Sequence, residues 1–239
     1  SPQPGQHAYT FTFRQRNGRL FRMNYLLFLP RSYNASDGQH WPLLVFLHGS
    51  REVGYDIRRL QRAVLPQMVE KNPDFPFVVL SPQAPTAAQG WYPALGAIRA
   101  LLDELQNSLS LDPSRIYLTG LSMGGYGAWA LAMADPQRFA AIVPVVGGYF
   151  YKPRQLCALK HKPIWVFGAR RDRNVPLRAS EEVVRALQAC GGAPRFTIFE
   201  DADHDRGWQL AYALPELYEW LLEQRQMHST AHQDSQVSP

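Results

Sequence analysis

The chain has 239 residues, of which 46% are hydrophobic, so it can bury the core of one large α/β domain and is not wholly disordered. Its formal net charge of +5 comes from scattered arginines without a dense basic run interleaved with aromatics, so we expect no nucleic acid partner. The sequence contains no run of 18 apolar residues, so we expect no transmembrane segment.

Strands and helices are predicted to alternate along the chain. The first two strands, at 9–14 and 22–29, flank Asn17-Gly18, a dipeptide that favours a hairpin, so the sheet should begin antiparallel. Short apolar runs then predict strands at 42–47, 77–81, 115–119, 141–146, 163–167 and 195–199. Helices are expected at 57–71, 95–109, 125–134, 179–189 and 209–226. This alternation predicts an α/β fold with a mostly parallel sheet and helices on both faces.

The same alternation of strands and helices indicates how many domains the chain contains. It continues without an internal repeat, so we expect a single domain over residues 1–226. The segment between the strands at 141–146 and 163–167 is too short for a large cap domain, so a site at the sheet edge should be open. Residues 227–239 are polar and are expected to form a flexible tail.

The most informative motif lies at 115–127, where an apolar run leads into Gly-Leu-Ser-Met-Gly with Ser122 at its centre. A strand, a sharp turn and a helix start in that order are typical of a nucleophile elbow, which exposes one hydroxyl above the sheet. Gly120 and Gly124 fit that geometry, because a β-carbon at either position would collide with the neighbouring strand or helix. The alternative is a glycine-rich turn with a surface serine.

A serine nucleophile requires a base and an acid that orients the base, and in this architecture they follow in the order acid, then histidine. Asp172 follows the predicted strand at 163–167, and His204 follows the strand at 195–199. His48 also follows a strand, but it precedes Ser122 and so has the wrong order. Three acids lie too close to His204 in sequence to orient it from another strand: Asp201, Asp203 and Asp205. The sequence thus predicts a catalytic triad of Ser122, Asp172 and His204.

The strand at 42–47 ends in His48-Gly49-Ser50, which is the expected place for an oxyanion-binding loop. The backbone N–H groups of Ser50 and Met123 are the candidate donors, and His48 is expected to support the loop. Aromatic residues near the rim can line an acyl pocket, although each of them is also compatible with ordinary packing. The candidate substrate contacts are Arg51, Trp91, Tyr126 and Trp208.

Cys157 and Cys190 are the only cysteines, and their spacing suits neither a metal site nor a redox motif. We expect two independent thiols, with a bridge between them left open. No metal-binding cluster is visible and serine acyl chemistry requires no cofactor, so we predict neither a metal nor a cofactor. Without a signal peptide pattern we expect a cytoplasmic protein, with a secreted form left open. The oligomeric state is not predicted.

With these residues the chain resembles α/β-hydrolase esterases of the group that includes predicted peptidases, phospholipase/carboxylesterase-type enzymes and polyhydroxybutyrate depolymerase-like esterases. The resemblance extends over residues 40–225. It rests on Leu-His-Gly at 47–49, Gly-Leu-Ser-Met-Gly-Gly-Tyr-Gly at 120–127, Gly-Ala-x-x-Asp-x-x-Val-Pro at 168–176, Asp-Ala-x-His-Asp at 201–205, and the ending at 215–222.

The resemblance implies that Ser122, Asp172 and His204 form the triad, with Ser50 and Met123 as oxyanion donors. It also implies hydrolysis of small or polymeric carboxylic esters through an acyl-enzyme. Peptidase or thioesterase chemistry on the same triad and a non-catalytic binding module are the alternatives. The chain departs from the group at Arg51, where relatives usually have glycine, so this side chain is expected to reshape the oxyanion loop or to place a cation near the acyl pocket.

Overall fold

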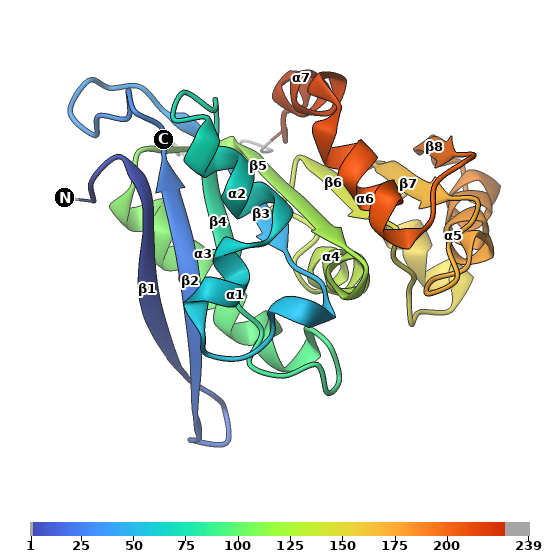
Figure 1. Ribbon diagram of the computed structural model, residues 1–239, viewed down its shortest axis with the longest axis horizontal. Helices are drawn as coiled ribbons and strands as arrows, with labels where there is room; N and C mark the ends of the chain where they lie inside the picture. Colours follow the sequence, from blue (N-terminus) through green and yellow to red (C-terminus); the bar gives the residue numbers. More distant parts are fainter. Residues whose placement is uncertain (1, 228–239) are drawn as a thin grey trace, which may run out of the picture.

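A computed structural model describes residues 2–227, and these residues form an eight-stranded sheet in the order β1-β2-β4-β3-β5-β6-β7-β8 (Figure 1). β1 and β2 run antiparallel to their neighbours, and the remaining strands are parallel. The strands are β1 Gly5–Arg14, β2 Leu20–Leu29, β3 Trp41–Leu47, β4 Val78–Pro82, β5 Leu111–Leu121, β6 Ala141–Val145, β7 Trp165–Ala169 and β8 Arg195–Phe199. The predicted α/β fold with an antiparallel start is therefore confirmed.

The hairpin of β1 and β2 forms one edge of the sheet, and β8 forms the other (Figure 1). The two strands pair over their whole length, from Gly5 opposite Leu29 to Arg14 opposite Leu20. Gly18 lies in the connecting turn with φ of +79°, a left-handed conformation that glycine adopts without steric penalty. The Asn17-Gly18 signal thus marked the turn correctly.

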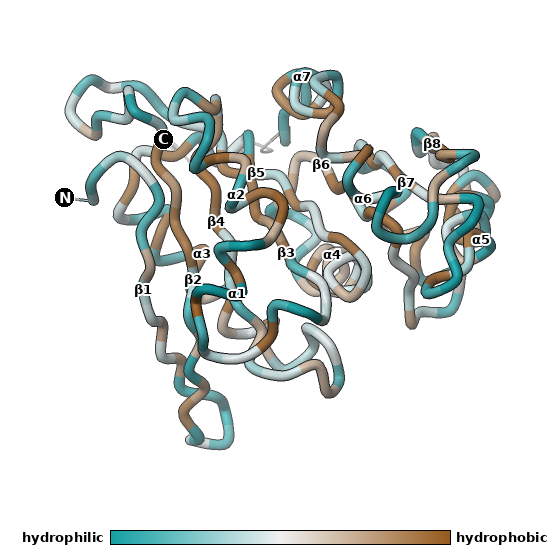
Figure 2. Tube along the Cα trace, viewed as in Figure 1, coloured by the Kyte–Doolittle hydropathy of each residue, from teal (hydrophilic) through white to brown (hydrophobic). Residues whose placement is uncertain are grey.

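Helices cover both faces of the sheet and bury two separate hydrophobic cores. α3, α4 and α5 lie on one face of the sheet, and α1, α2, α6 and α7 lie on the other (Figure 1). The apolar side chains of the first group belong to one core and those of the second group to the other. In Figure 2 the hydrophobic residues concentrate on strands such as β2 and β4, whereas α5 carries many hydrophilic positions. The helices are α1 Ile57–Gln61, α2 Val64–Lys71, α3 Leu95–Ser108, α4 Met123–Ala134, α5 Leu177–Ala189, α6 His204–Ala213 and α7 Pro215–Glu223, with 3-10 helices η1 Ser50–Glu52, η2 Tyr92–Ala94 and η3 Pro153–Leu159.

The single helix predicted at 57–71 is wrong, because this segment forms α1 and α2. Pro66 lies in the first turn of α2, and in a continuous helix its ring would collide with the carbonyl group of Arg62. The chain therefore leaves the helical conformation at Ala63, which is extended with ψ of 156°, and starts a new helix.

The helix predicted at 209–226 is also divided, into α6 and α7, and it begins earlier than expected. Pro215 is the first residue of α7, a position where its missing N–H is not needed, and it keeps Leu214 extended. α6 starts at His204 because the side chain of Asp203 caps it, accepting the N–H of Arg206 at 2.9 Å.

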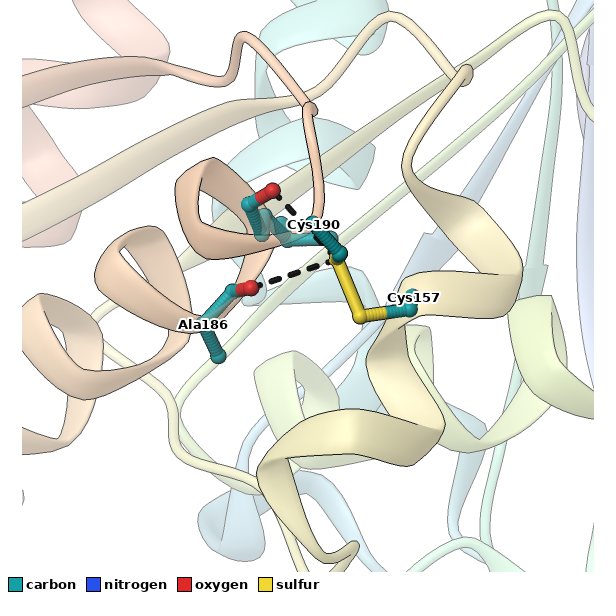
Figure 3. The surroundings of a disulfide bond; sticks show 4 residues. Cys157, Ala186 and Cys190 are labelled. Carbon is teal, nitrogen blue, oxygen red and sulfur yellow. Dashed lines mark hydrogen bonds between the residues drawn. A yellow bond between two sulfur atoms is a disulfide. The ribbon is translucent and has the colours of Figure 1, made fainter.

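The expectation of two independent thiols is wrong, because Cys157 and Cys190 form a disulfide with their Cα atoms 6.0 Å apart (Figure 3). Cys157 belongs to η3 and Cys190 is the C-cap of α5. The Cys190 sulfur also lies 3.3 Å from the carbonyl oxygen of Ala186. The pairing depends on the approach of η3 to α5 in space, which the sequence separation of 33 residues does not reveal.

The sheet topology brings the predicted site together. β3, β5, β7 and β8 are parallel, so their carboxyl ends reach the same edge of the sheet. The segments that follow these four strands carry Ser50, Ser122, Asp172 and His204. In α/β sheets ligands bind at this edge, and the site is described next. Residues 228–239, most of the predicted flexible tail, and residue 1 lie outside the described residues.

Candidate active site

Ser122 occupies a sharp turn between β5 and α4. Its backbone has φ of 53° and ψ of −116°, a conformation that a residue with a β-carbon rarely adopts. A β-carbon on Gly124 would overlap the carbonyl oxygen of Leu47, and one on Gly120 would overlap the carbonyl oxygen of Gly124. The two glycines therefore allow α4 to start directly against β3 and β5, which exposes the Ser122 side chain at the sheet edge.

Three side chains from distant parts of the chain form a continuous series of hydrogen bonds. His204 Nε2 lies 2.9 Å from Ser122 Oγ, and His204 Nδ1 lies 2.7 Å from Asp172 Oδ2. The other carboxylate oxygen of Asp172 accepts the backbone N–H groups of Asn174 at 2.9 Å and Val175 at 2.8 Å. Asp172 is thereby held by its own loop, with one oxygen free to orient the imidazole.

Burial makes these polar contacts stronger than they would be in water. Asp172 and His204 each retain only 8% of their exposed surface, so water competes little for the hydrogen bond between them. His204 was expected in a loop and is instead the first residue of α6. That position fixes the start of its side chain on a helix that packs against β7.

The loop after β3 lies beside the Ser122 turn. Ser50 begins η1 and lines a small cavity together with Ser122 and His204. Met123 is the first residue of α4, so its backbone N–H has no acceptor within the helix. The amides of Ser50 and Met123 thus come from the two segments that the sequence analysis expected to flank the nucleophile.

His48 is fully buried beneath this loop and acts as a structural group. Its Nε2 accepts the N–H of Ala84 at 2.9 Å, so its Nδ1 carries the proton and points to the carbonyl oxygen of Gly49. Trp91 donates its indole N–H to the carbonyl oxygen of His48 at 3.1 Å. Burial lowers the pKa of His48 to about 4, so the ring is neutral near pH 7. These bonds agree with the expected supporting role.

A cavity of about 750 Å³ opens from Ser122 along α4. Trp91 and Tyr126, two of the predicted substrate contacts, line it together with Met123, Tyr92 and Phe150. The other two predicted contacts, Arg51 and Trp208, instead line the small cavity beside Ser50. Arg51 also forms an ion pair with Asp205 at 3.1 Å, so its cation lies away from the large cavity.

Asn174 is the polar residue shared by these cavities that the sequence analysis did not identify. Asn174 borders the large cavity, the small cavity and a third cavity beside His204. Its position two residues after Asp172, in the loop that the sequence already placed at the sheet edge, is the signal that could have identified it.

No group of three His, Cys, Asp or Glu side chains within residues 2–227 is arranged to hold a metal ion. Over the same residues, none of the helices combines the length and apolar character needed to span a membrane.

Comparisons with known proteins agree with this architecture. The model of the dienelactone hydrolase family matches residues 86–205, half of the chain and the part that contains Ser122, Asp172 and His204. A crystal structure of a thermostable esterase is 32% identical, with a TM-score of 0.74, over 91% of this chain and 63% of that chain. A feruloyl esterase module from Clostridium thermocellum, complexed with sinapinate, shares the fold at 17% identity and a TM-score of 0.69, over 97% of this chain and 94% of that one.

A curated relative matches a shorter stretch. Poly(3-hydroxyalkanoate) depolymerase C of Paucimonas lemoignei is 38% identical over 52 residues, which are 22% of this chain and 13% of the depolymerase. This chain therefore spans less than two thirds of the length of both the thermostable esterase and the depolymerase. The family match, together with the fold and the sheet-edge site, shows that the chain belongs to the dienelactone hydrolase family, among the α/β-hydrolase esterases.

Proposed function

We propose that this protein is a serine carboxylesterase that hydrolyses small or polymeric esters through a covalent acyl-enzyme. Ser122 is the nucleophile, His204 the general base and acid, and Asp172 the group that orients His204. The observation that carries this proposal is the unbroken series of hydrogen bonds from Ser122 Oγ through the imidazole to the Asp172 carboxylate.

In the acylation step, Ser122 Oγ attacks the ester carbonyl carbon while its proton moves to His204 Nε2. The Asp172 carboxylate at Nδ1 keeps the imidazole in the tautomer whose Nε2 is free to accept that proton, and it stabilises the imidazolium that forms. Negative charge develops on the former carbonyl oxygen, where the amides of Ser50 and Met123 donate hydrogen bonds.

The intermediate then collapses. The carbon–oxygen bond to the alcohol breaks, His204 Nε2 returns its proton to the departing oxygen, and the acyl group remains on Ser122. Water repeats the sequence in the second half-reaction: His204 removes a proton from water, the resulting hydroxide attacks the acyl carbon, and Ser122 recovers its proton as the acid leaves.

Covalent labelling tests the nucleophile. A fluorophosphonate should label the wild-type protein stoichiometrically and should not label Ser122→Ala, whereas the matched control Ser36→Ala, at an exposed loop serine, should be labelled like wild type. Hydrolysis of p-nitrophenyl butyrate should fall by about 10⁴-fold or more in Ser122→Ala. Equal labelling of Ser122→Ala, or no labelling of folded wild type, would overturn the proposal. Faster turnover of peptides or thioesters than of esters would overturn the substrate class.

A further inference from the structure

We infer that the cavity along α4 binds the acyl half of the substrate and that the polar groove beside His204 binds the alcohol half. The preferred substrates are then esters that join a bulky aromatic acid to a polar alcohol. This inference rests on the proposed function and goes further, because it assigns each half of the ester to a cavity.

The assignment follows from the role of the histidine. In the tetrahedral intermediate the central carbon carries Ser122 Oγ, the oxyanion, the alcohol oxygen and the acyl substituent. His204 must protonate the alcohol oxygen, so the alcohol lies on the side of His204. The oxyanion lies between the amides of Ser50 and Met123. The acyl substituent is left to point away from His204.

The cavities differ in whether Ser122 or His204 lines them. The large cavity of about 750 Å³ is lined by Ser122 and Met123 but not by His204. The polar groove beside His204, with a volume of about 450 Å³, is lined by His204 but not by Ser122. Of these three cavities, the small one beside Ser50 is also lined by Ser122. Its volume of about 90 Å³ is too small for a substantial substituent. The acyl group therefore enters the large cavity.

Aromatic rings give the large cavity its character. The rings of Tyr126 and Phe150 lie 4.7 Å apart at an interplanar angle of 31°, near the offset stacking that aromatic pairs favour. Phe150 is 72% exposed and Tyr92 is 44% exposed, so their faces are available to a ligand. Trp91 also lines the cavity and is almost completely buried. A flat apolar acyl group can stack on these rings.

A glycine brings the tryptophan into place. A β-carbon on Gly127 would lie 2.6 Å from the Trp91 ring, so only glycine lets α4 pack directly on the indole. The indole N–H is already used by the carbonyl group of His48, so the wall that Trp91 presents has no free donor. This wall favours an apolar group over a polar one.

The groove beside His204 has the opposite chemistry. Its lining residues are all polar or charged: Arg171, Arg173, Asn174, Asp203, His204 and Asp205. Several of these groups already have partners, since Arg171 pairs with Asp201 and Asp205 pairs with Arg51. Arg173 is exposed and forms no salt bridge among residues 2–227. Its guanidinium is free to donate hydrogen bonds to the oxygen atoms of a hydroxylated alcohol.

Two isomeric esters test this orientation, because they contain the same groups with the ester bond reversed. In 2-hydroxyethyl 3-phenylpropanoate the ring is on the acyl side, and in 3-phenylpropyl hydroxyacetate it is on the alcohol side. After each kcat/KM is normalised to the rate of alkaline hydrolysis, the first ester should be preferred by about three- to tenfold, the gain expected from one well-stacked ring. Equal rates or preference for the reversed isomer would overturn the inference.

Variants locate the two halves. Phe150→Ala should lower the ratio of kcat/KM for 2-hydroxyethyl 3-phenylpropanoate over 2-hydroxyethyl acetate by about five- to tenfold. Tyr55→Ala, which removes an exposed ring outside these cavities, is the matched control and should leave the ratio unchanged. Arg173→Ala should lower the preference for the 2-hydroxyethyl over the propyl ester of 3-phenylpropanoate by about threefold. An unchanged ratio in Phe150→Ala would overturn the acyl assignment.

The two proposals fail in different ways. If wild type is not labelled by a fluorophosphonate and hydrolyses neither isomer, the proposed esterase function is wrong. If wild type is labelled at Ser122 and hydrolyses the reversed isomer faster, the esterase function holds and the orientation is wrong.

Discussion

The disulfide between Cys157 and Cys190 is expected to contribute strongly to stability. It joins residues 33 positions apart and encloses β7 and the loop that carries Asp172. Restricting the unfolded chain by a loop of this length corresponds to about 3.7 kcal/mol at 25 °C in the chain-entropy description. A domain of this size changes its Tm by roughly 2 °C for each kcal/mol, so loss of the bridge should lower Tm by about 7 °C.

Thermal unfolding followed by circular dichroism measures this effect. Oxidised wild type should be compared with wild type in dithiothreitol and with the double variant Cys157→Ala/Cys190→Ala. Both cysteines are half-buried, so alanine leaves little cavity and the double variant should match the reduced wild type. Dithiothreitol should not change the Tm of the double variant, which controls for effects of the reductant.

Two results would refute this reasoning. One is the titration of two free thiols in wild-type protein denatured without reductant, because no bridge would then exist. The other is a fall in Tm of less than about 2 °C on reduction, which would mean that the enclosed loop does not limit the unfolded chain.

The disulfide also bears on the cellular location, because disulfides persist in oxidising compartments. The cytoplasmic location stays a prediction, and the bridge favours the secreted form that the sequence left open.

Three further perturbations are predicted. In the folded protein His48 stays neutral down to about pH 4, whereas in the unfolded chain it binds a proton below about pH 6.5. The free energy of unfolding should therefore fall by about 3 kcal/mol as the pH is lowered from 6.5 to 4. Urea titrations should give a shallower pH dependence for His48→Asn, and an equal one would contradict this. Gly124→Ala should destabilise the protein by about 3 kcal/mol, since its methyl group overlaps the Leu47 carbonyl; a Tm equal to that of wild type would contradict this. Asp172→Asn should lower kcat by about 10⁴-fold with little change in Tm, because its side-chain oxygen can still accept the loop amides; near-normal kcat would contradict the orienting role.

Local patterns in the sequence were sufficient for much of the fold and the candidate site. The run at 42–47 has no polar residue and became β3, which is buried at every position. The glycines around Ser122 indicated a sharp turn, because a β-carbon at Gly120 or Gly124 would overlap neighbouring backbone atoms. Because parallel strands end at one edge, the order of strands and loops was enough to predict that Ser122, Asp172 and His204 converge.

The predictions that failed involve either a proline that overrides the local helical pattern or a contact between segments that are far apart in the sequence. Pro66 and Pro215 lie in sequences with continuous helical periodicity, and the apolar pattern concealed the steric break that each proline imposes. The disulfide depends on how η3 folds back between β6 and β7 toward α5, a tertiary approach with no local signal. The division of the substrate contacts between cavities likewise depends on which loops meet, so Arg51 was assigned without knowledge of its partner Asp205.

The positions of the three side chains of the proposed triad are determined separately, and this separation has a consequence for variants. Ser122 is placed by glycine contacts between α4 and β3, Asp172 by amides of its own loop, and His204 by the capped start of α6. Two hydrogen bonds join these independently supported groups. If these groups act as proposed, replacing one of them should abolish the esterase activity without removing the packing that positions the others, so we expect variants at this site to be folded but inactive. Of the rings that border the large cavity, only Tyr126 lies on α4, whereas Trp91, Tyr92 and Phe150 come from segments between β4 and α3 and between β6 and η3, so substrate preference can change at these three positions while Ser122, Asp172 and His204 stay in place.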